Sequence, residues 1–323
     1  MHIYEKLFAT FAKCGAFLPA TSQRQCPAAN AGGFSRKAKV MIKIAIQSKG
    51  RLNEDTTQLL ADAGITVGAG HRQLISRAKG FDMEALYLRD DDIPQAVSMG
   101  VADAGIVGQN EVEERGEPLR VVMRLGFSAC RLSLAVPKDS SYDGLRWFDG
   151  RRIATSYPRI LSQFFESENI RAEIHEIAGS VEVAPAVGMA DAIFDIVSSG
   201  GTLLQNGLTE VHTVMQSEAV LVASRQLPPD KERDIEKLCF RFRSIIDSRG
   251  LKYVVMNIPA DRVAAAVGML PGMKSPTVLP LADPAWSSLH VVIRQSELWD
   301  KIEQLKQMGA QDILVLALEN IIR

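Results

Sequence analysis

The sequence has few of the residues that build metal centres and disulfide frameworks. Its four cysteines lie far apart without a Cys-x-x-Cys pair, and its five histidines form no His-x-x-x-His pair. The ligand spacings typical of zinc sites are thus absent, neither a zinc centre nor a disulfide framework is expected, and a cytoplasmic location is expected. If a metal takes part, oxygen-liganded Mg²⁺ carried on a substrate is the better expectation.

Long apolar runs and the common nucleotide loops are also missing. No segment approaches the roughly 18 consecutive apolar residues that cross a bilayer, so no membrane function is expected. No Gly-x-x-x-x-Gly-Lys precedes Ser or Thr, and no Gly-x-Gly-x-x-Gly opens a first strand-helix unit. A phosphate bound by this chain is therefore not held by either of these standard loops.

An excess of charge of one sign is absent overall. The 323 residues carry a formal net charge of −1. Residues 1 to 40 hold six Lys or Arg and one Glu, which leaves 31 basic and 37 acidic side chains, net −6, in the remainder. Such a body is not a general nucleic-acid binder, so an anionic ligand needs locally placed cations. The basic, acid-poor composition of residues 1 to 40 is typical of a disordered or transit-like extension, or of translation from an upstream start codon, and a regular fold is expected from Met41.

The most informative stretch runs from Gly179 to Leu203 and predicts a helix, a buried strand and a glycine-bearing loop. The apolar run 192–197 is typical of a parallel strand covered on both faces. The loop 198–202 follows at once, with backbone N–H groups and hydroxyls where another helix would open. Such a loop can bind phosphate, but it is also typical of an ordinary capped connection. Asp195, just before the loop, suits ribose hydroxyls or a divalent cation.

Cations follow two other predicted strands. The strand 42–47 is followed by Lys49 and Arg51, before a helix expected from Asn53, and the strand 83–88 is followed by Arg89. Ligands of open α/β sheets bind at such strand ends, although solvated loop cations give the same pattern.

A short motif occurs twice at the same kind of junction. The segment 99–104, Met-Gly-Val-Ala-Asp-Ala, recurs at 187–192 as Val-Gly-Met-Ala-Asp-Ala, with each Gly and Asp displaced by 88 residues. In both copies a helix is expected to end on Gly and a buried strand to start after Asp. Two related α/β lobes facing across a cleft are the simplest architecture.

The predicted elements divide the chain from Met41 into three parts. Residues 41–132 with 206–228 form a first lobe, to which two late strands return, and residues 133–205 form a second lobe. Residues 229–323 form a linker helix followed by a β-α-β-β-α-β series, which is the ferredoxin-like order. Small domains of this kind serve as ligand sensors or oligomerisation units, and the fold alone does not show which role applies.

With these residues set out, the chain from Met41 to Arg323 resembles the long form of ATP phosphoribosyltransferase, the first enzyme of histidine biosynthesis. The family signature is filled without a gap by Glu182, Gly188, Ala190, Ile193, Asp195, Ser199, Gly200, Thr202 and Leu203. Other matching segments are 47–52, 89–94, 154–158 and 271–281, whereas residues 1 to 40 have no counterpart.

The resemblance implies an α/β fold with two lobes of the type II periplasmic-binding-protein kind and a C-terminal ferredoxin-like regulatory domain. It implies that Asp195 faces the ribose of phosphoribosyl pyrophosphate and that Lys49 and Arg51 stabilise charge on pyrophosphate. The loop residues that would hold the 5′-phosphate are Ser198, Ser199, Gly200, Gly201 and Thr202. Candidate contacts to ATP or ribose are Arg89, Arg131, Tyr157 and Glu182. For Tyr157 and Glu182, a role at a helix cap is an open alternative.

The resemblance also implies a reaction and its control. N1 of the adenine ring of ATP would attack C1 of phosphoribosyl pyrophosphate, and pyrophosphate would leave with Mg²⁺, so no protein nucleophile is required. Histidine would bind the C-terminal domain, where Thr277 and Leu279 are candidate regulatory residues, inhibit the enzyme and shift it between dimeric and hexameric forms.

Two rival functions stay open beside the enzyme. A two-lobed protein can bind a small ligand without chemistry, and a ligand-sensing regulator can combine the same lobes with a sensor domain. An exported binding protein is expected to carry a signal peptide, and Lys13 interrupts the only apolar stretch near the N-terminus. The phosphate loop preceded by an acid favours the enzyme over both.

Overall fold

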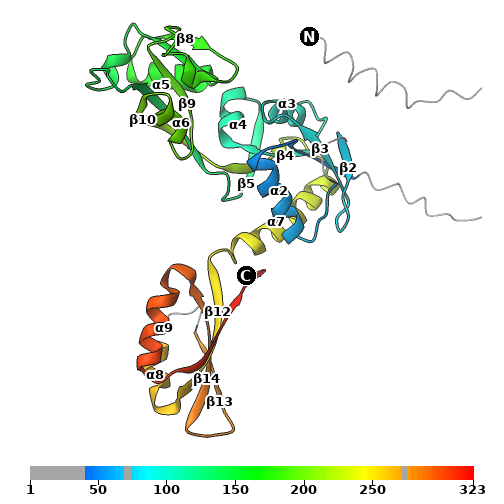
Figure 1. The fold of residues 1–323 in the computed structure, drawn as a ribbon. Coiled ribbons are helices and arrows are strands. Elements are labelled where there is room, and N and C mark those ends of the chain that lie inside the picture. Colours follow the sequence, from blue (N-terminus) through cyan, green and yellow to red (C-terminus); the bar gives the residue numbers. More distant parts are fainter. Residues whose placement is uncertain (1–40, 69–73, 271–274) are drawn as a thin grey trace, which may run out of the picture. The chain divides into compact units, whose positions relative to one another are not determined.

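The computed structural model describes residues 41–68, 74–270 and 275–323 (Figure 1). The predictions for residues 1 to 40 and for Pro271 and Gly272 lie outside the described residues. The described residues form helices and three β-sheets, which confirms the predicted α/β class. Among these residues no helix is both long and apolar enough to cross a membrane.

The first sheet places the carboxyl ends of two predicted ligand-binding strands side by side. Its strand order is β2-β3-β1-β4-β11-β5, and β1 runs parallel to β3 and β4. The strands are β1 (Ile42–Gln47), β2 (Ile75–Arg77), β3 (Met83–Leu88), β4 (Ala104–Gly108), β5 (Leu119–Arg124) and β11 (Ala219–Ser224). The helical segments of this part are α2 (Arg51–Asp62), η2 (Asp90–Asp92), α3 (Ile93–Ser98) and α4 (Gln109–Arg115).

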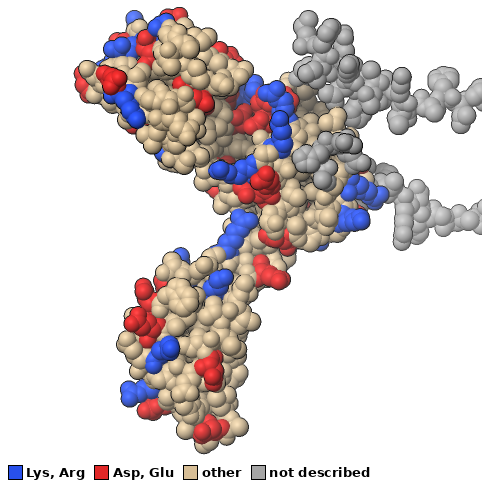
Figure 2. All heavy atoms as spheres, viewed as in Figure 1, with Lys and Arg blue, Asp and Glu red and all other residues tan. Residues whose placement is uncertain are grey.

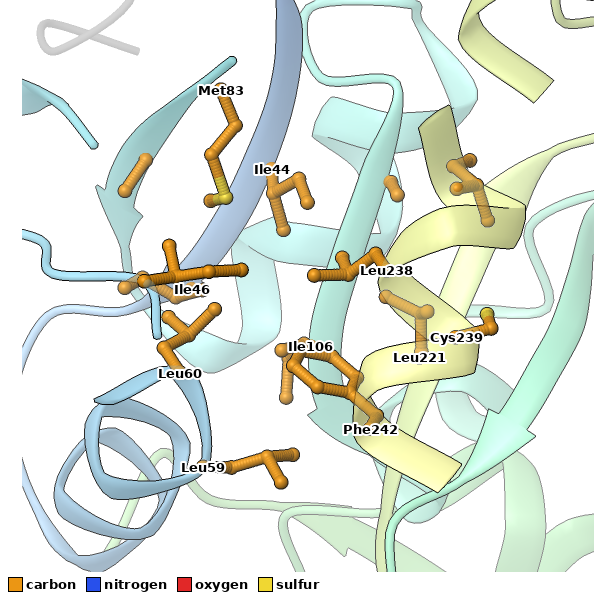
Figure 3. Close-up of a cluster of buried hydrophobic side chains, with 14 of the residues drawn as sticks. Ile44, Ile46, Leu59, Leu60, Met83, Ile106, Leu221, Leu238, Cys239 and Phe242 are labelled. Atoms are coloured by element: carbon orange, nitrogen blue, oxygen red, sulfur yellow. The ribbon is translucent and has the colours of Figure 1, made fainter. Parts of the chain in front are cut away.

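Helix α7 (Pro229–Ile246) belongs to the core of the first sheet. We expected an amphipathic helix over residues 230–248 as a linker between the lobes and the C-terminal domain. The structure adds that the apolar stripe of α7 is buried in one cluster with strand residues such as Ile44 and Leu221, where it covers a sheet face that would otherwise contact water (Figure 3). The buried α7 side chains are Ile235, Leu238, Cys239, Phe242 and Ile245.

The second sheet takes in one strand that we assigned to the first lobe. Its order is β10-β6-β9-β7-β8. We expected the strand near 210–216 to return to the first lobe, but β10 pairs antiparallel with β6 along its length, and only β11 joins the first sheet. The strands are β6 (Cys130–Pro137), β7 (Arg152–Thr155), β8 (Glu173–Glu176), β9 (Ala192–Val197) and β10 (Leu208–Ser217). The helical segments are η3 (Leu145–Phe148), α5 (Pro158–Glu168), η4 (Val181–Val183) and α6 (Gly201–Gln205).

The repeated motif forms the same hydrogen-bonded junction in both sheets. The Asp103 carboxylate accepts a hydrogen bond from the backbone N–H of Lys43, 2.8 Å away, at the start of β1. The Asp191 carboxylate likewise accepts from the N–H of Arg152, 2.9 Å away, at the start of β7. Asp103 precedes β4 and thus fixes the start of the neighbouring strand β1, and Asp191 precedes β9 and fixes the start of the neighbouring strand β7.

The predicted helix before the second copy is not regular. The segment forms only the short η4, followed by turns in which the N–H of Gly188 donates to the carbonyl of Pro185, 3.1 Å away. Pro185 has no N–H to donate, which removes one bond of a regular helix. The expected end on glycine is present in both copies, since Gly100 and Gly188 have φ of 73° and 72°.

The C-terminal domain has the predicted ferredoxin-like order. Its antiparallel sheet is ordered β13-β14-β12-β15, and a separate apolar cluster lies between this sheet and its helices. The elements are β12 (Leu251–Pro259), η5 (Ala260–Arg262), α8 (Val263–Met269), β13 (Thr277–Pro280), β14 (Trp286–Arg294), η6 (Gln295–Glu297), α9 (Leu298–Gln307) and β15 (Gln311–Ala317). The β-α-β-β-α-β prediction is therefore confirmed.

The packing of α7 on the first sheet makes a stability prediction. We expect Phe242→Ala to lower the free energy of unfolding by about 3–5 kcal/mol, because the ring is 0% exposed and its loss leaves a cavity. Phe240→Ala, on the same helix with Phe240 54% exposed, should change it by no more than about 0.5 kcal/mol. Urea unfolding of both variants measures the difference, and equal effects would contradict the packing of α7.

Candidate functional site

The loop 198–202 leaves β9 and enters α6 through a left-handed turn. Gly200 precedes the helix with φ of 78°, a conformation that glycine adopts without the strain that a Cβ imposes. The side chains of Ser198, Ser199 and Thr202 are exposed. Among the described residues, the Ser198 and Thr202 hydroxyls have no hydrogen-bond partner, so they are available to a ligand together with the first amides of α6.

Asp195 precedes the loop in a half-buried position beside a second acid. Its carboxyl has a pKa raised to about 6, chiefly by burial and also by the negative charge of Glu182, while a hydrogen bond from the Ile196 amide acts in the opposite direction. Glu182 itself lies in η4 and caps no helix through its side chain. Two carboxylates next to the loop favour a ligand that brings hydroxyl donors or a cation.

Arg131 holds the start of the loop rather than standing free. Its guanidinium donates two hydrogen bonds to the Glu210 carboxylate, at 2.6 and 2.5 Å, and one to the carbonyl of Ser198, at 3.1 Å. The bonds from Arg131 are the main cause that lowers the pKa of Glu210 to about 2. The pair therefore ties β6 and β10 to the first residue of the loop.

The predicted cations of the first sheet differ in how they are engaged. Lys49 and Arg51 are exposed, and neither has a hydrogen-bond or ion-pair partner among the described residues. Arg51 is the first residue of α2, so the helix begins two residues earlier than the expected Asn53. Arg89, by contrast, donates to both oxygens of Asp91, at 3.0 and 3.1 Å, although its side chain is 76% exposed.

Tyr157 is buried and its hydroxyl already has partners within the protein. It donates to Glu111, 2.9 Å away, and accepts from the side-chain amide of Asn110, 3.2 Å away. A ligand contact through this hydroxyl would require these bonds to be exchanged. Sequence reasoning missed Asn110 and Glu111, although polar residues directly after the buried strand β4 were a signal of the same kind as those after β1 and β3.

The two regulatory candidates lie on the edge strand β13 of the C-terminal sheet. Thr277 and Leu279 are exposed and pair with His290 and Ser288 of β14. The His290 ring is hydrogen-bonded on both sides, to the Tyr253 hydroxyl at 2.9 Å and to Ser288 at 3.1 Å. These polar groups lie on the sheet face opposite the apolar cluster.

The structure groups the predicted residues by sheet. The loop, Asp195, Glu182 and Arg131 gather around the end of β9, whereas Lys49, Arg51 and Arg89 follow the adjacent strands β1 and β3. Within residues 41–68, 74–270 and 275–323 no group of three or more His, Cys, Asp or Glu is arranged to hold a metal ion. Figure 2 shows acidic and basic side chains intermixed over the face in view.

Comparison with known families gives matches to two family models. Residues 89–244 match the model described as HisG, ATP phosphoribosyltransferase. Residues 248–320 match the model described as HisG, C-terminal domain.

Curated relatives and a solved structure agree with these matches. The chain is 52% identical over 282 residues to the ATP phosphoribosyltransferase of Parabacteroides distasonis, and the alignment covers 87% of this chain and all of the relative. The enzyme of Cytophaga hutchinsonii is 47% identical over 283 residues, 88% of this chain and 99% of the relative. A chain of the HisG:HisZ complex from Thermotoga maritima superposes with a TM-score of 0.56 at 27% identity, covering 64% of this chain and 99% of that one.

Proposed function

Because this chain belongs to the ATP phosphoribosyltransferase family, and is therefore a pentosyltransferase of histidine biosynthesis, we propose that it transfers the phosphoribosyl group of phosphoribosyl pyrophosphate to N1 of the adenine ring of ATP and releases pyrophosphate. The observation that carries the proposal is the unbroken family signature from Glu182 to Leu203, which folds into β9, the left-handed turn at Gly200 and the start of α6. Family membership favours an enzyme over the binding-protein and regulator alternatives.

We assign phosphoribosyl pyrophosphate to the loop of the second sheet. Ser198, Ser199, Gly200, Gly201 and Thr202 would hold the 5′-phosphate through backbone amides and through hydroxyls that lack partners among the described residues. Asp195 would accept hydrogen bonds from the ribose hydroxyls, and Glu182 lies close enough to raise its pKa. Arg131 would keep the loop in place through its bond to Ser198 and reach the ligand only by leaving Glu210.

We assign the ATP and pyrophosphate charges to the first sheet. Lys49 and Arg51, which are exposed and unpaired among the described residues, would stabilise the negative charge that develops on the leaving pyrophosphate. Arg89 would contribute to ATP binding only if it exchanges its bonds to Asp91, so we rank it below Lys49 and Arg51. Tyr157 would contact ATP only if its hydroxyl first gave up its bonds to Glu111 and Asn110.

The chemistry requires alignment rather than a protein nucleophile. The attacking atom is N1 of the adenine ring, and the bond that breaks joins C1 of the ribose to the pyrophosphate oxygen. The chain's own residues would bind and orient the two substrates, which lowers the barrier by restricting their relative motion. When bound, Mg²⁺ would neutralise pyrophosphate charge, and we propose that it is held mainly by the substrate.

We propose that the C-terminal domain binds histidine as an inhibitor and shifts a cytoplasmic homo-oligomer between dimeric and hexameric forms. The Thermotoga maritima chain is titled as part of a complex with HisZ. The present chain carries its own domain over residues 248–320, where Thr277 and Leu279 are the candidate regulatory residues. No nucleic-acid or membrane partner is proposed.

One assay tests the proposed function. Incubation with ATP, phosphoribosyl pyrophosphate and Mg²⁺ should release pyrophosphate and form phosphoribosyl-ATP in equal amounts. Chelation of Mg²⁺ should stop both, and millimolar histidine should slow both. Well-folded protein that turns over neither substrate would refute the enzyme proposal, and a rate independent of histidine would refute the regulatory one.

The loop assignment makes a residue-level prediction. We expect Thr202→Val to weaken binding of phosphoribosyl pyrophosphate by about 1–3 kcal/mol, because it removes one hydrogen bond to a charged phosphate. The Michaelis constants for both substrates measure the effect, and that for ATP should change little. Thr209→Val is the matched control, since Thr209 is exposed on β10 of the same sheet. Equal Michaelis constants in wild type and Thr202→Val would show that the loop is merely structural.

A further inference from the structure

A buried polar cluster joins α4, which follows the first sheet, to α5, which belongs to the second. Glu111 of α4 is 7% exposed. One of its carboxylate oxygens accepts a hydrogen bond from the Tyr157 hydroxyl at 2.9 Å and another from the Asn110 amide at 3.0 Å. The cluster includes Tyr157, a candidate contact to ATP, and the charge of Asp195 is near enough to raise the pKa of the Tyr157 hydroxyl. A buried acid at a contact between the two sheets needs an explanation, because burying an ionised carboxylate is costly.

A second acid on the same helix strengthens this contact. Glu114, three residues after Glu111, accepts hydrogen bonds from the backbone N–H groups of Arg159 and Ile160, at 2.9 and 3.0 Å. These are first-turn amides of α5, which have no partner within their own helix. The helices also approach closely at Gly116, where a Cβ would lie 1.6 Å from the Arg159 guanidinium. The two helices, both labelled in Figure 1, therefore meet through specific bonds.

The same cluster is tied to the point where the chain passes between the sheets. The Asn110 backbone N–H donates to the Ser217 hydroxyl at 3.1 Å, and that hydroxyl donates to the Asn110 side chain at 2.8 Å. Ser217 ends β10 of the second sheet, and β11 of the first sheet begins at Ala219. The cluster therefore adjoins the passage of the chain from the second sheet to the first.

We propose that Glu111 is a positioning residue whose proton sets the contact between α4 and α5: the neutral carboxyl keeps the contact closed, and the ionised carboxylate weakens it. The consequence for catalysis rests on the proposed function, in which each sheet carries one substrate. Closing the contact would then set the separation between adenine and the phosphoribosyl group.

Burial, modified by the charges around it, places the titration of Glu111 near neutral pH. Burial is the main cause that raises the pKa of Glu111 to about 7, and the nearby acids Asp90 and Asp91 of η2 raise it further. The hydrogen bond from Tyr157 and the positive charge of Arg115 act in the opposite direction. The balance of these groups leaves the carboxyl close to half-ionised at neutral pH.

Groups from the other elements complete the surroundings. The Cys130 thiol of β6 has a pKa that burial raises and that the charge of Glu111 raises further, so it is neutral at the pH values concerned. On α5, the positively charged Arg159 contacts Gly116. On α4, Glu114 is engaged with the α5 amides.

The direction of the pH effect follows from these values. A carboxyl freed into water titrates near its ordinary pKa of 4.5, whereas in the closed contact Glu111 titrates at about 7. The closed contact is thus most favoured below about pH 4.5, weakens as the pH rises toward 7, and is constant above that. Within this window the ratio of closed to open protein should fall by at most about tenfold per pH unit.

Hydrogen exchange of the Arg159 and Ile160 amides measures the contact without requiring turnover. Exchange protection, corrected for the intrinsic pH dependence, should fall in wild type by up to about tenfold per pH unit between about pH 5.5 and 7. Glu111→Gln, which keeps a hydrogen-bond acceptor but cannot ionise, should show protection that does not vary with pH. Glu113→Gln is the matched control, because Glu113 is an exposed acid on the same helix, and it should behave as wild type.

Two further measurements keep the proposal open to refutation. Tyr157→Phe removes the hydrogen bond that lowers the pKa of Glu111, so the midpoint of the pH dependence should move upward. The pH profile of kcat/KM should show a matching change between about pH 5.5 and 7 in wild type and in Glu113→Gln, and Glu111→Gln should lack that change. Wild-type protection that is flat with pH, or a Glu111→Gln variant that follows wild type, would overturn the proposal. A protein without turnover but with the predicted exchange pattern would refute only the proposed function.

Discussion

The structure depends on two passages of the chain between its first two sheets. The chain leaves β5 of the first sheet for β6 of the second, and it returns from β10 to β11 with only Glu218 between them. Because β10 and β6 pair along their length, both passages are held side by side. Each sheet can then carry its own polar strand ends, while the few residues at the passages determine how the sheets meet.

Local patterns in the sequence were sufficient to predict much of the fold. Apolar runs gave the bounds of β1, β3 and β9 without error, and turn glycines such as Gly100 and Gly188 marked the repeated junction. The sequence could not tell which sheet would receive β10 or α7, because both present apolar faces that suit either core. Long-range pairing and burial decided these assignments, and neither is visible in local periodicity.

The candidate site was predictable where the family signature is continuous and less so elsewhere. The turn at Gly200 and the position of Asp195 agree with the expectation from sequence, and their roles stay proposals. The sequence could not show that Arg131 and Arg89 have acidic partners, Glu210 and Asp91. The sequence also could not reveal the contact between Glu111 and Tyr157, because these residues are 46 positions apart and meet only when two helices pack.

We propose that each of the first two sheets holds one substrate. Hydrogen exchange with each substrate alone tests it most directly. With Mg²⁺ present, phosphoribosyl pyrophosphate should slow exchange of the amides at 198–203, whereas ATP alone should slow exchange at 49–53 and leave the amides at 198–203 unchanged. Slowing at 49–53 by phosphoribosyl pyrophosphate, with no change at 198–203, would contradict the account.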